Sequence, residues 1–179
     1  MLSLCNASPA ADAAPPLLVF DAQVTLLSAQ GARQVPLTDF FVGPGQTVMA
    51  SSELLTETLL PSARETEGSA FLKLGRVGAD IAKVSVATRV VREGDTIVDG
   101  KIALGSVAPI PLRVRQAEEH LIGQRFTNGI VEEASQLAAQ EISPITDVRS
   151  TASYRTSVAQ VLVRDALITA WNRSGGEPV

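Results

Sequence analysis

The stretch VSVATRVVREGDTIVDGKIALG, residues 84–105, decides the fold class of this chain. Both of its halves are rich in Val, Ile and Thr, the residue types that favour β-strands. The polar segment Glu93–Asp95 separates them and contains a central glycine, as hairpin turns commonly do. We therefore predict two long strands, Val84–Val91 and Thr96–Leu104, paired as an antiparallel hairpin.

Three helical patterns follow this hairpin, after the strand-breaking segment APIPLR. They cover Val114–Ile122, Asn128–Glu141 and Ser153–Trp171. The last pattern carries a wide apolar stripe, which we expect to pack on the sheet. The stripe consists of Val158, Val161, Leu162, Ala166, Ile168 and Ala170. Strands followed by helices predict an α+β fold, an antiparallel sheet covered on one face by three helices, and not a doubly wound α/β fold.

A separate block precedes the long hairpin. AQVTLLSAQGARQVPL, residues 22–37, predicts a shorter hairpin, and ELLTETLLP, residues 53–61, predicts a strand that ends at its proline. The polar segment SARETEG, residues 62–68, is the predicted boundary. We expect one domain over residues 1–62 and a second over residues 67–172.

The first block opens with NASPAADAAPPLLVFD, residues 6–21, which has the chemistry of a helix start. Ser8 can cap and Pro9 suits the first helical position, so we predict a helix over residues 9–19. The unpaired amides of a helix end can receive a phosphate, and Asp12 could accept a hydrogen bond from a sugar hydroxyl. A simple capped helix explains the same residues, and residue types alone favour that explanation.

Three loops carry further candidate residues. FFVGPGQT lacks the spacing of a phosphate-binding loop, so we expect Phe40 and Phe41 to anchor it structurally. KLGRVGADIAK crowds charges of both signs, which either tune a bound cofactor or face solvent. In ISPITDVRSTASYR, Asp147 and Arg149 can form an ion pair and Ser150 can cap the next helix.

The composition excludes several functions. The net charge is −4 and no stripe rich in Lys and Arg is present, which argues against a nucleic-acid partner. His120 is the only histidine, which excludes a multi-histidine metal site, and Cys5 is the only cysteine, which fits a reducing compartment. No run of about 18 apolar residues predicts a membrane span, and the first residues lack the basic region of a signal peptide. We expect a cytoplasmic protein and assign no catalytic residue or metal ligand.

Six segments in order resemble the FAD-binding subunit of the molybdenum hydroxylases, the family of the carbon monoxide dehydrogenase medium chain and the xanthine dehydrogenase flavin domain. They are NASPAAD, PLTDFFVGPGQT, SELLTETLLP, SAFLKLGRVGADIAKVSVA, IALGSVAPIPLR and EISPITDVRSTASYR. In that family the flavin passes electrons from iron–sulfur clusters to an acceptor, while the molybdenum subunit performs the hydroxylation. The resemblance implies FAD as the cofactor, and [2Fe-2S] clusters and the molybdenum cofactor in partner subunits.

The resemblance also implies a set of cofactor-binding residues. NASPAAD resembles the segment near the FAD diphosphate and ribitol, and the strand that follows Glu53 resembles one that lines the flavin. Lys73 stands one position after the lysine that xanthine dehydrogenases place near the isoalloxazine ring, where Leu72 is found here. Asp80 is the acidic residue of the loop beside the flavin face. The implied residues are Asn6, Ser8, Asp12, Leu54, Leu55, Lys73 and Asp80.

The family has two glycine-rich phosphate-binding loops, and the second, TIGG-like loop stands just ahead of the segment that resembles NASPAAD. This chain opens with MLSLC at that place, so the resemblance implies an N-terminally truncated chain. The expected partners are the iron–sulfur and molybdenum subunits and a chain that supplies the phosphate-binding loops. The alternative is a non-catalytic interaction module that docks onto the other hydroxylase subunits.

Overall fold

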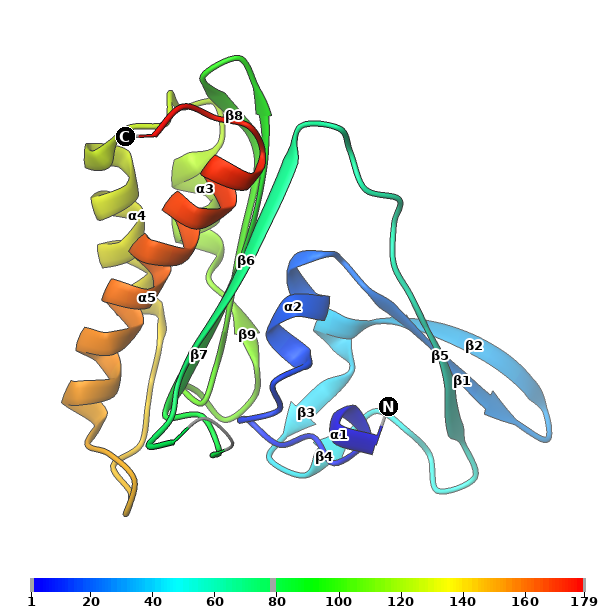
Figure 1. Ribbon diagram of the computed structural model, residues 1–179. Helices are drawn as coiled ribbons and strands as arrows, with labels where there is room; N and C mark the ends of the chain where they lie inside the picture. Colours follow the sequence, from blue (N-terminus) through cyan, green and yellow to red (C-terminus); the bar gives the residue numbers. More distant parts are fainter. Residues whose placement is uncertain (1, 78–79, 179) are drawn as a thin grey trace.

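A computed structural model describes residues 2–77 and 80–178. It confirms the α+β class: one group of elements forms a sheet with helices on one face, and a smaller group packs against the other face (Figure 1). The helices are α1 (Leu2–Cys5), α2 (Ala14–Val19), the 3₁₀ helix η1 (Leu37–Asp39), α3 (Arg115–Leu121), α4 (Asn128–Glu141) and α5 (Ala152–Arg173). The strands are β1 (Gln23–Ser28), β2 (Gly31–Pro36), β3 (Phe41–Gly43), β4 (Gln46–Thr47), β5 (Leu54–Leu59), β6 (Glu67–Leu74), β7 (Val84–Glu93), β8 (Thr96–Gly105) and β9 (Leu112–Arg113).

The predicted long hairpin forms the centre of a four-stranded antiparallel sheet with the order β6-β7-β8-β9. Gly94 has a φ of 58° at the turn between β7 and β8, a conformation that glycine adopts without strain. The segment APIPLR was expected to break the sheet, but its end forms β9, which pairs with Ala103 and Leu104 of β8. Nearly all of β7 is buried, because elements cover both faces of the sheet.

Three helices cover one face of this sheet, as predicted. Helix α5 contacts β6 and β7, α4 packs beside α5, and α3 packs beside α4. The predicted stripe on α5 is partly wrong: Ala166 and Ala170 are buried, but Val161 is exposed and the buried face is shifted by one residue. Small residues bring α5 close to β6, where a Cβ added to Gly68 would lie 2.0 Å from the carbonyl oxygen of Ala170.

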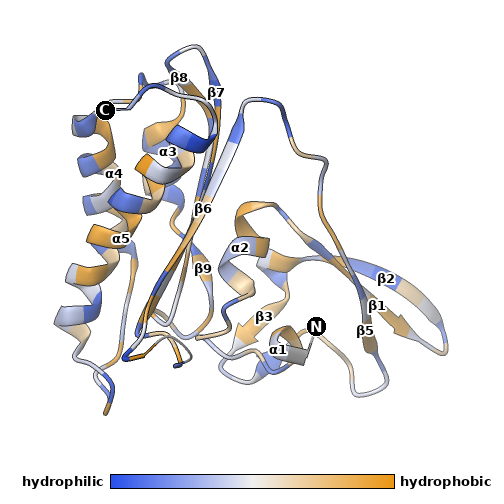
Figure 2. Cartoon of the chain, viewed as in Figure 1, coloured by the Kyte–Doolittle hydropathy of each residue, from blue (hydrophilic) through white to orange (hydrophobic). Residues whose placement is uncertain are grey.

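The N-terminal group contains a three-stranded antiparallel sheet with the order β2-β1-β5, which confirms the predicted hairpin and the strand after Glu53. Helix α2 contacts β7 and β8 on the face opposite the long helices, so it links the two groups. Ala87 and Ala103 belong to the same buried cluster as α2. Figure 2 shows hydrophobic stretches in α2 and β1 and hydrophilic stretches on α4 and α5.

One predicted helix start and one predicted helix cap are wrong. The helix expected over residues 9–19 begins at Ala14, and its cap residue Ala13 makes no side-chain hydrogen bond. The cap of α5 is Thr151, whose hydroxyl accepts from the amide of Tyr154 at 3.3 Å, and not Ser150. Phe40 and Phe41 are buried edge-to-face, as expected for anchors of their loop.

Candidate functional site

The segment NASPAAD forms a turn that ties the two groups of elements together. The amide of Gly45 donates to the carbonyl of Ala7 at 3.0 Å, and the amide of Ser106 donates to the carbonyl of Pro9 at 2.7 Å. Ala7 and Ser106 have φ values of 42° and 65°, which are strained for non-glycine residues. Because the carbonyls of Ala7 and Pro9 accept hydrogen bonds from the neighbouring segments, these backbone contacts fix the conformation of the turn.

The expected anion-receiving helix end is absent from this turn. The hydroxyl of Ser8 accepts from the amide of Ala10 at 3.3 Å, while α2 begins six residues after Ser8. The side chains of Asn6, Ser8 and Asp12 are nevertheless exposed. The turn presents a hydroxyl, an amide and a carboxylate to the surface instead of a row of unpaired helix amides.

Asp12 and Lys73 form the contact that joins two predicted site segments. Lys73 Nζ donates to Asp12 Oδ2 at 2.6 Å, across 61 positions of sequence. Lys73 extends from β6, on the face opposite the long helices, where β6 faces the turn. The side chain of Asp12 is 50% exposed, and surface pairs of this kind contribute about 0–1 kcal/mol. Either charge can therefore exchange its partner for a ligand at small cost.

The other predicted site residues lie apart from this pair. Leu54 and Leu55 are on β5, in the three-stranded sheet, whereas Lys73 belongs to the four-stranded sheet. Leu54 is 69% exposed, while Leu55 is partly buried against the N-terminal core. In front of them Glu53 accepts two hydrogen bonds from Arg33, at 2.6 and 2.8 Å. This pairing with Arg33 is the main reason that the pKa of Glu53 falls to about 2.

Asp80 is held by its own loop. Arg76 Nε donates to Asp80 Oδ2 at 2.8 Å, and the amide of Ile81 donates to Asp80 Oδ1 at 2.8 Å. The hydrogen bond from Arg76 is the largest cause of a lowered pKa at Asp80. The two positions just before Asp80, which belong to the predicted flavin-facing loop, lie outside the described residues. The roles of all seven predicted residues toward a flavin stay predictions.

A groove of about 390 Å³ lies beside the NASPAAD turn. It is lined by Ser8, Pro9, Ala10, Pro44, Ile81, Ala82, Ser106, Ala108, Pro109, Ile145, Asp147, Arg149 and Arg155. The turn is thus open on the side of the bend after β6. Sequence reasoning did not single out Ser106 or Arg155.

Arg155 organises the wall of this groove from the first turn of α5. Its Nη1 donates to the carbonyls of Lys83 and Ser106, at 2.6 and 3.0 Å, and its Nη2 donates to Asp147 at 2.8 Å. The predicted pair of Asp147 with Arg149 is present but longer, at 3.8 Å. Asp147 has a lowered pKa, mainly because it accepts the amide of Arg149. No local sequence pattern indicated this pair, because Asp147 lies in the connection before α5 and the fold brings it to Arg155.

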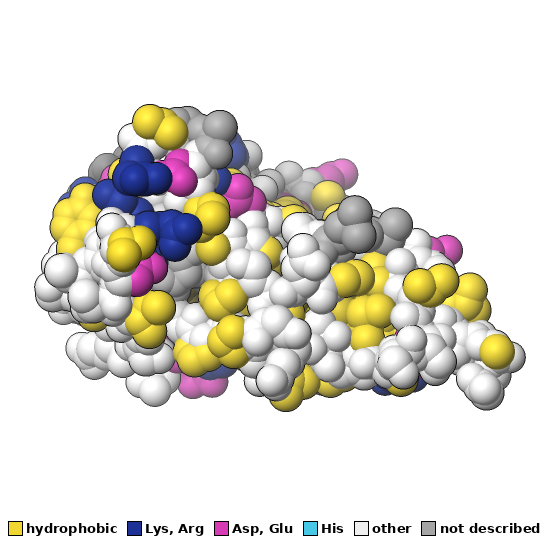
Figure 3. All heavy atoms as spheres, turned by 90° about the horizontal axis from the view of Figure 1, so that it is seen from below, with side chains coloured by type: hydrophobic (Ala, Val, Ile, Leu, Met, Phe, Trp, Pro, Cys, Tyr) yellow, Lys and Arg dark blue, Asp and Glu magenta, His cyan; other side chains and the backbone are white. Residues whose placement is uncertain are grey.

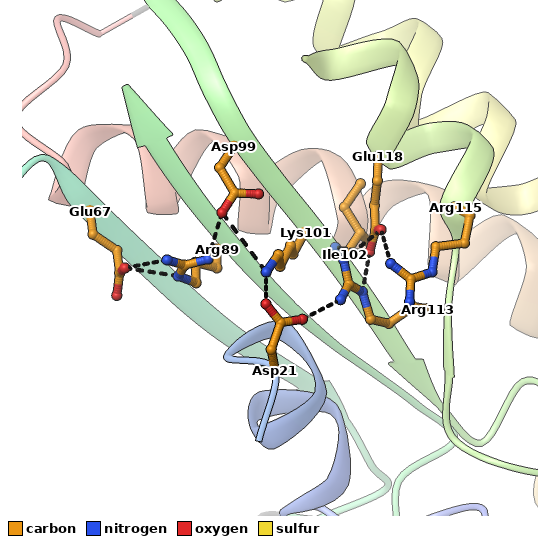
Figure 4. Close-up of polar contacts among 9 residues, drawn as sticks. All are labelled: Asp21, Glu67, Arg89, Asp99, Lys101, Ile102, Arg113, Arg115 and Glu118. Carbon is orange, nitrogen blue, oxygen red and sulfur yellow. Dashed lines mark hydrogen bonds and ion pairs between the residues drawn. The ribbon is translucent and has the colours of Figure 1, made fainter. Parts of the chain in front are cut away.

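A chain of ion pairs crosses the junction between α2 and the large sheet (Figure 4). Asp21, two residues after α2, accepts hydrogen bonds from Lys101 and from Arg113, the latter at 2.7 Å. Arg113 also forms a two-pronged pair with the buried Glu118, at 2.6 and 2.7 Å. Burial is the largest cause of a lowered pKa at Lys101, and the positive charge of Arg113 adds to it.

The same chain continues along the sheet. Arg89 is buried between Glu67, at 2.7 Å, and Asp99, at 2.9 Å (Figure 4). The carboxylates of Glu67 and Asp99 therefore neutralise the positive charge of Arg89 within the protein. We infer that these linked ion pairs hold α2, and the turn that precedes it, in position on the sheet.

Within residues 2–77 and 80–178, no group of three or more His, Cys, Asp or Glu side chains is placed to hold a metal ion. His120 forms a contact of 2.9 Å with Glu133. No helix in the described part of the chain is long and apolar enough to cross a membrane.

Two successive segments of the chain match models of known protein families. Residues 3–63 match the FAD binding domain in molybdopterin dehydrogenase, and residues 69–170 match the CO dehydrogenase flavoprotein C-terminal domain. The second match alone covers more than half of the chain.

Individual relatives agree with these matches. The glyceraldehyde dehydrogenase medium chain of Sulfolobus acidocaldarius is 32% identical over 92% of this chain and 58% of its own length. The carbon monoxide dehydrogenase medium chain of Hydrogenophaga pseudoflava is 33% identical over 87% of this chain and 54% of its own. The xanthine dehydrogenase FAD-binding subunit of Escherichia coli O157:H7 is 27% identical over 98% of this chain and 61% of its own. The chain therefore spans somewhat more than half the length of these relatives.

Solved structures show the same fold. Carbon monoxide dehydrogenase from Hydrogenophaga pseudoflava, in a form that lacks the Mo-pyranopterin moiety of its cofactor, matches with a TM-score of 0.93 and 32% identity over 96% of this chain and 60% of that chain. Reconstituted CO dehydrogenase from Oligotropha carboxidovorans matches with a TM-score of 0.91 and 30% identity over the same shares. From sequence and fold together, the chain belongs to the family of FAD-binding medium subunits of the molybdenum hydroxylases.

Proposed function

We propose that this chain forms one wall of an FAD site in a molybdenum-containing hydroxylase. The observation that carries the proposal is the ion pair between Asp12 and Lys73, which brings a predicted ribitol-binding segment and a predicted ring-binding strand to one place. The match of residues 3–63 to an FAD binding domain supports the same assignment.

The side chains at this place fit the sugar chain and ring of FAD better than its phosphates. The exposed carboxylate of Asp12 can accept hydrogen bonds from ribityl hydroxyls. Lys73 can keep a positive charge beside the ring, and Phe71, two residues earlier on β6, is also partly exposed. We propose that Asn6 and Ser8 hold the neighbouring part of the cofactor and that Leu54 and Leu55 supply an apolar flank.

FAD supplies the electron-carrying chemistry when it is bound. The chain's own residues orient the ring and set its electrostatic surroundings. A positive charge at Lys73 favours the reduced flavin, which carries more negative charge. Asp80 lies on the loop after β6, where we propose that it controls the approach of the electron acceptor. Iron–sulfur and molybdenum subunits would complete the electron path.

FAD retention tests this proposal. The chain is co-expressed with the part of the Hydrogenophaga pseudoflava medium chain that the match does not cover. Bound flavin is then measured by visible absorbance after gel filtration. Asp12→Asn should weaken FAD binding about tenfold, because a hydrogen bond to a charged group contributes roughly 1.5–3 kcal/mol. Lys73→Met should shift the flavin reduction potential to lower values.

Asp39→Asn is the matched control, because Asp39 is also exposed but lies in η1. Equal FAD affinity in the Asp12 and Asp39 variants would remove Asp12 from the site. A wild-type complex that elutes together but remains colourless would contradict the flavin role itself.

A second candidate function, an assembly module without flavin, is favoured by one observation. Leu54, Leu59 and Leu60 are exposed at or beside the edge strand β5, and apolar patches of this kind often mark interfaces. This function predicts stable binding to the iron–sulfur or molybdenum subunit in the absence of FAD. It also predicts that substitutions at Ser8 and Asp12 leave the activity of the assembled enzyme unchanged.

A further inference from the structure

The groove beside the NASPAAD turn is a cavity that the Asp12–Lys73 contact of the proposed flavin wall does not account for. Asp12 and Lys73 are not among its lining residues. It lies where the bend after β6, the connection between α4 and α5 and the Ser8 turn converge, at the lower end of the molecule in Figure 1. Its volume of about 390 Å³ is within the range of small-molecule sites, roughly 300–1,000 Å³.

Most of the groove wall is apolar. Pro9, Pro44, Ala82, Ala108 and Pro109 contribute carbon surface. Two further lining residues, Ile81 and Ile145, are 50% and 68% exposed, so a ligand would cover apolar surface that now contacts solvent. A compact apolar body matches this wall.

The groove also has donors that lack acceptors. Ser106 Oγ and Arg155 Nε are buried and have no hydrogen-bond partner among the residues that the structure describes. An unsatisfied buried donor is costly, and native structures rarely leave one. Both residues line the groove, but the two atoms lie beneath its surface, so an acceptor on a ligand bonds to them when the side chains turn toward the groove.

The net positive charge of the groove wall favours a ligand whose hydrogen-bond acceptor is negatively charged. Arg149 and Arg155 both approach Asp147, at 3.8 and 2.8 Å, which leaves one positive charge in excess among these three lining residues. Lys83 lies close by, over the ring of Tyr154. Figure 3 shows Lys and Arg side chains gathered toward the helix-bearing end of this face, with hydrophobic side chains across its middle.

We propose that this groove binds a small monocarboxylate with an apolar body, its carboxylate toward Ser106 and Arg155 and its body against the proline and alanine wall. The proposal rests on the apolar wall and on Ser106, Arg149 and Arg155; it shares only Ser8 with the proposed flavin wall and needs no cofactor.

Benzoate is the probe, and neutral benzamide, with the same number of non-hydrogen atoms, is the matched control ligand. Amide chemical shifts of the purified chain are followed by NMR during titration. Benzoate should produce saturable shifts at Ser8, Ala82 and Ala108, with a Kd on the order of 1 mM for a ligand of this size. Benzamide should bind at least threefold more weakly.

Two pairs of variants locate the site. Ala108→Leu fills the groove and should abolish the benzoate shifts, whereas Ala63→Leu, in the exposed segment between β5 and β6, should leave them unchanged. Arg149→Gln should weaken benzoate about threefold at low salt without affecting benzamide, whereas Arg64→Gln should change neither.

Equal binding of benzoate and benzamide, unaffected by Arg149→Gln, would overturn the proposal and assign the buried donors to ordered water. Absence of saturable shifts, or benzoate shifts that persist in Ala108→Leu, would overturn it as well. Because Arg149 is a surface residue, its variant tests the proposal even if Ala108→Leu does not fold.

Discussion

Glu118→Ala tests whether the ion-pair chain at the junction stabilises the fold. Glu118 is buried, and its carboxylate accepts two hydrogen bonds from Arg113 and one from the amide of Ile102, at 2.9 Å. Truncation leaves the guanidinium of Arg113, itself only 5% exposed, with Asp21 as its acidic partner, and leaves the Ile102 amide without an acceptor.

The expected loss follows from this geometry. Removing one partner of a buried ion pair costs about 3–5 kcal/mol. Asp21 still neutralises part of the charge on Arg113, so we expect the lower part of that range, about 3–4 kcal/mol in the free energy of unfolding. For a chain of this length, each kcal/mol shifts Tm by roughly 2–4 °C, so Tm should fall by about 6–16 °C.

Urea unfolding, followed by circular dichroism, measures this loss, and calorimetry measures the change in Tm. The control is Arg125→Ala, which breaks an exposed pair with Asp95 and should cost less than about 1 kcal/mol. The double variant Glu118→Met with Arg113→Met should recover most of the stability, because it leaves no uncompensated buried charge. A Glu118→Ala variant as stable as Arg125→Ala would refute the stabilising role of the buried ion pairs at the junction.

Two further measurements test the packing and the electrostatics. Gly68→Ala should destabilise the protein severely, as urea midpoints will report, because the new Cβ would lie 2.0 Å from the carbonyl oxygen of Ala170; Gly129→Ala, in an open part of α4, should instead stabilise it by about 0.4–1 kcal/mol. Equal effects of the two alanines would contradict the close approach of α5 to β6. The pKa of Glu53 is lowered from 4.5 to about 2 by Arg33, so the unfolded chain binds the proton more readily, and stability from this pair should be lost as the pH falls from about 4.5 to about 2. In Glu53→Gln the urea midpoint should fall less steeply with decreasing pH over that interval than in the wild-type protein. An equally steep fall would argue against the stabilising pair.

Much of the local structure follows from residues that act on their neighbours. The β-branched residues of VSVATRVV and TIVDGKIAL specify the two long strands, because strand preference and a polar turn are local properties. The patterns of α3, α4 and α5 predict those helices to within one or two residues of their ends. The order of the six segments also indicates the family correctly.

The predictions that are wrong concern residues whose partners are distant in the sequence. Ser8 and Pro9 resemble a helix start, but the backbones of Gly45 and Ser106 hold this segment in a turn, and no local pattern contains that information. The close approach at Gly68 brings Ala170 against β6. The buried face of α5 lies one residue beyond the predicted stripe, and it includes Ala159, Val163, Leu167 and Trp171 in addition to Ala166 and Ala170.

The sequence by itself determined the α+β class, the main strands and helices, and the family, because these depend on short-range preferences and on recognisable segments in order. Only the tertiary structure decided that Asp12 pairs with Lys73 and that Arg155, not Arg149, is the nearer partner of Asp147. It also decided that the groove beside the Ser8 turn has buried donors without a partner among the described residues. The physical reason is that ion pairs and cavities form between segments that the fold brings together. Their energies depend on distances and burial that a linear pattern does not specify.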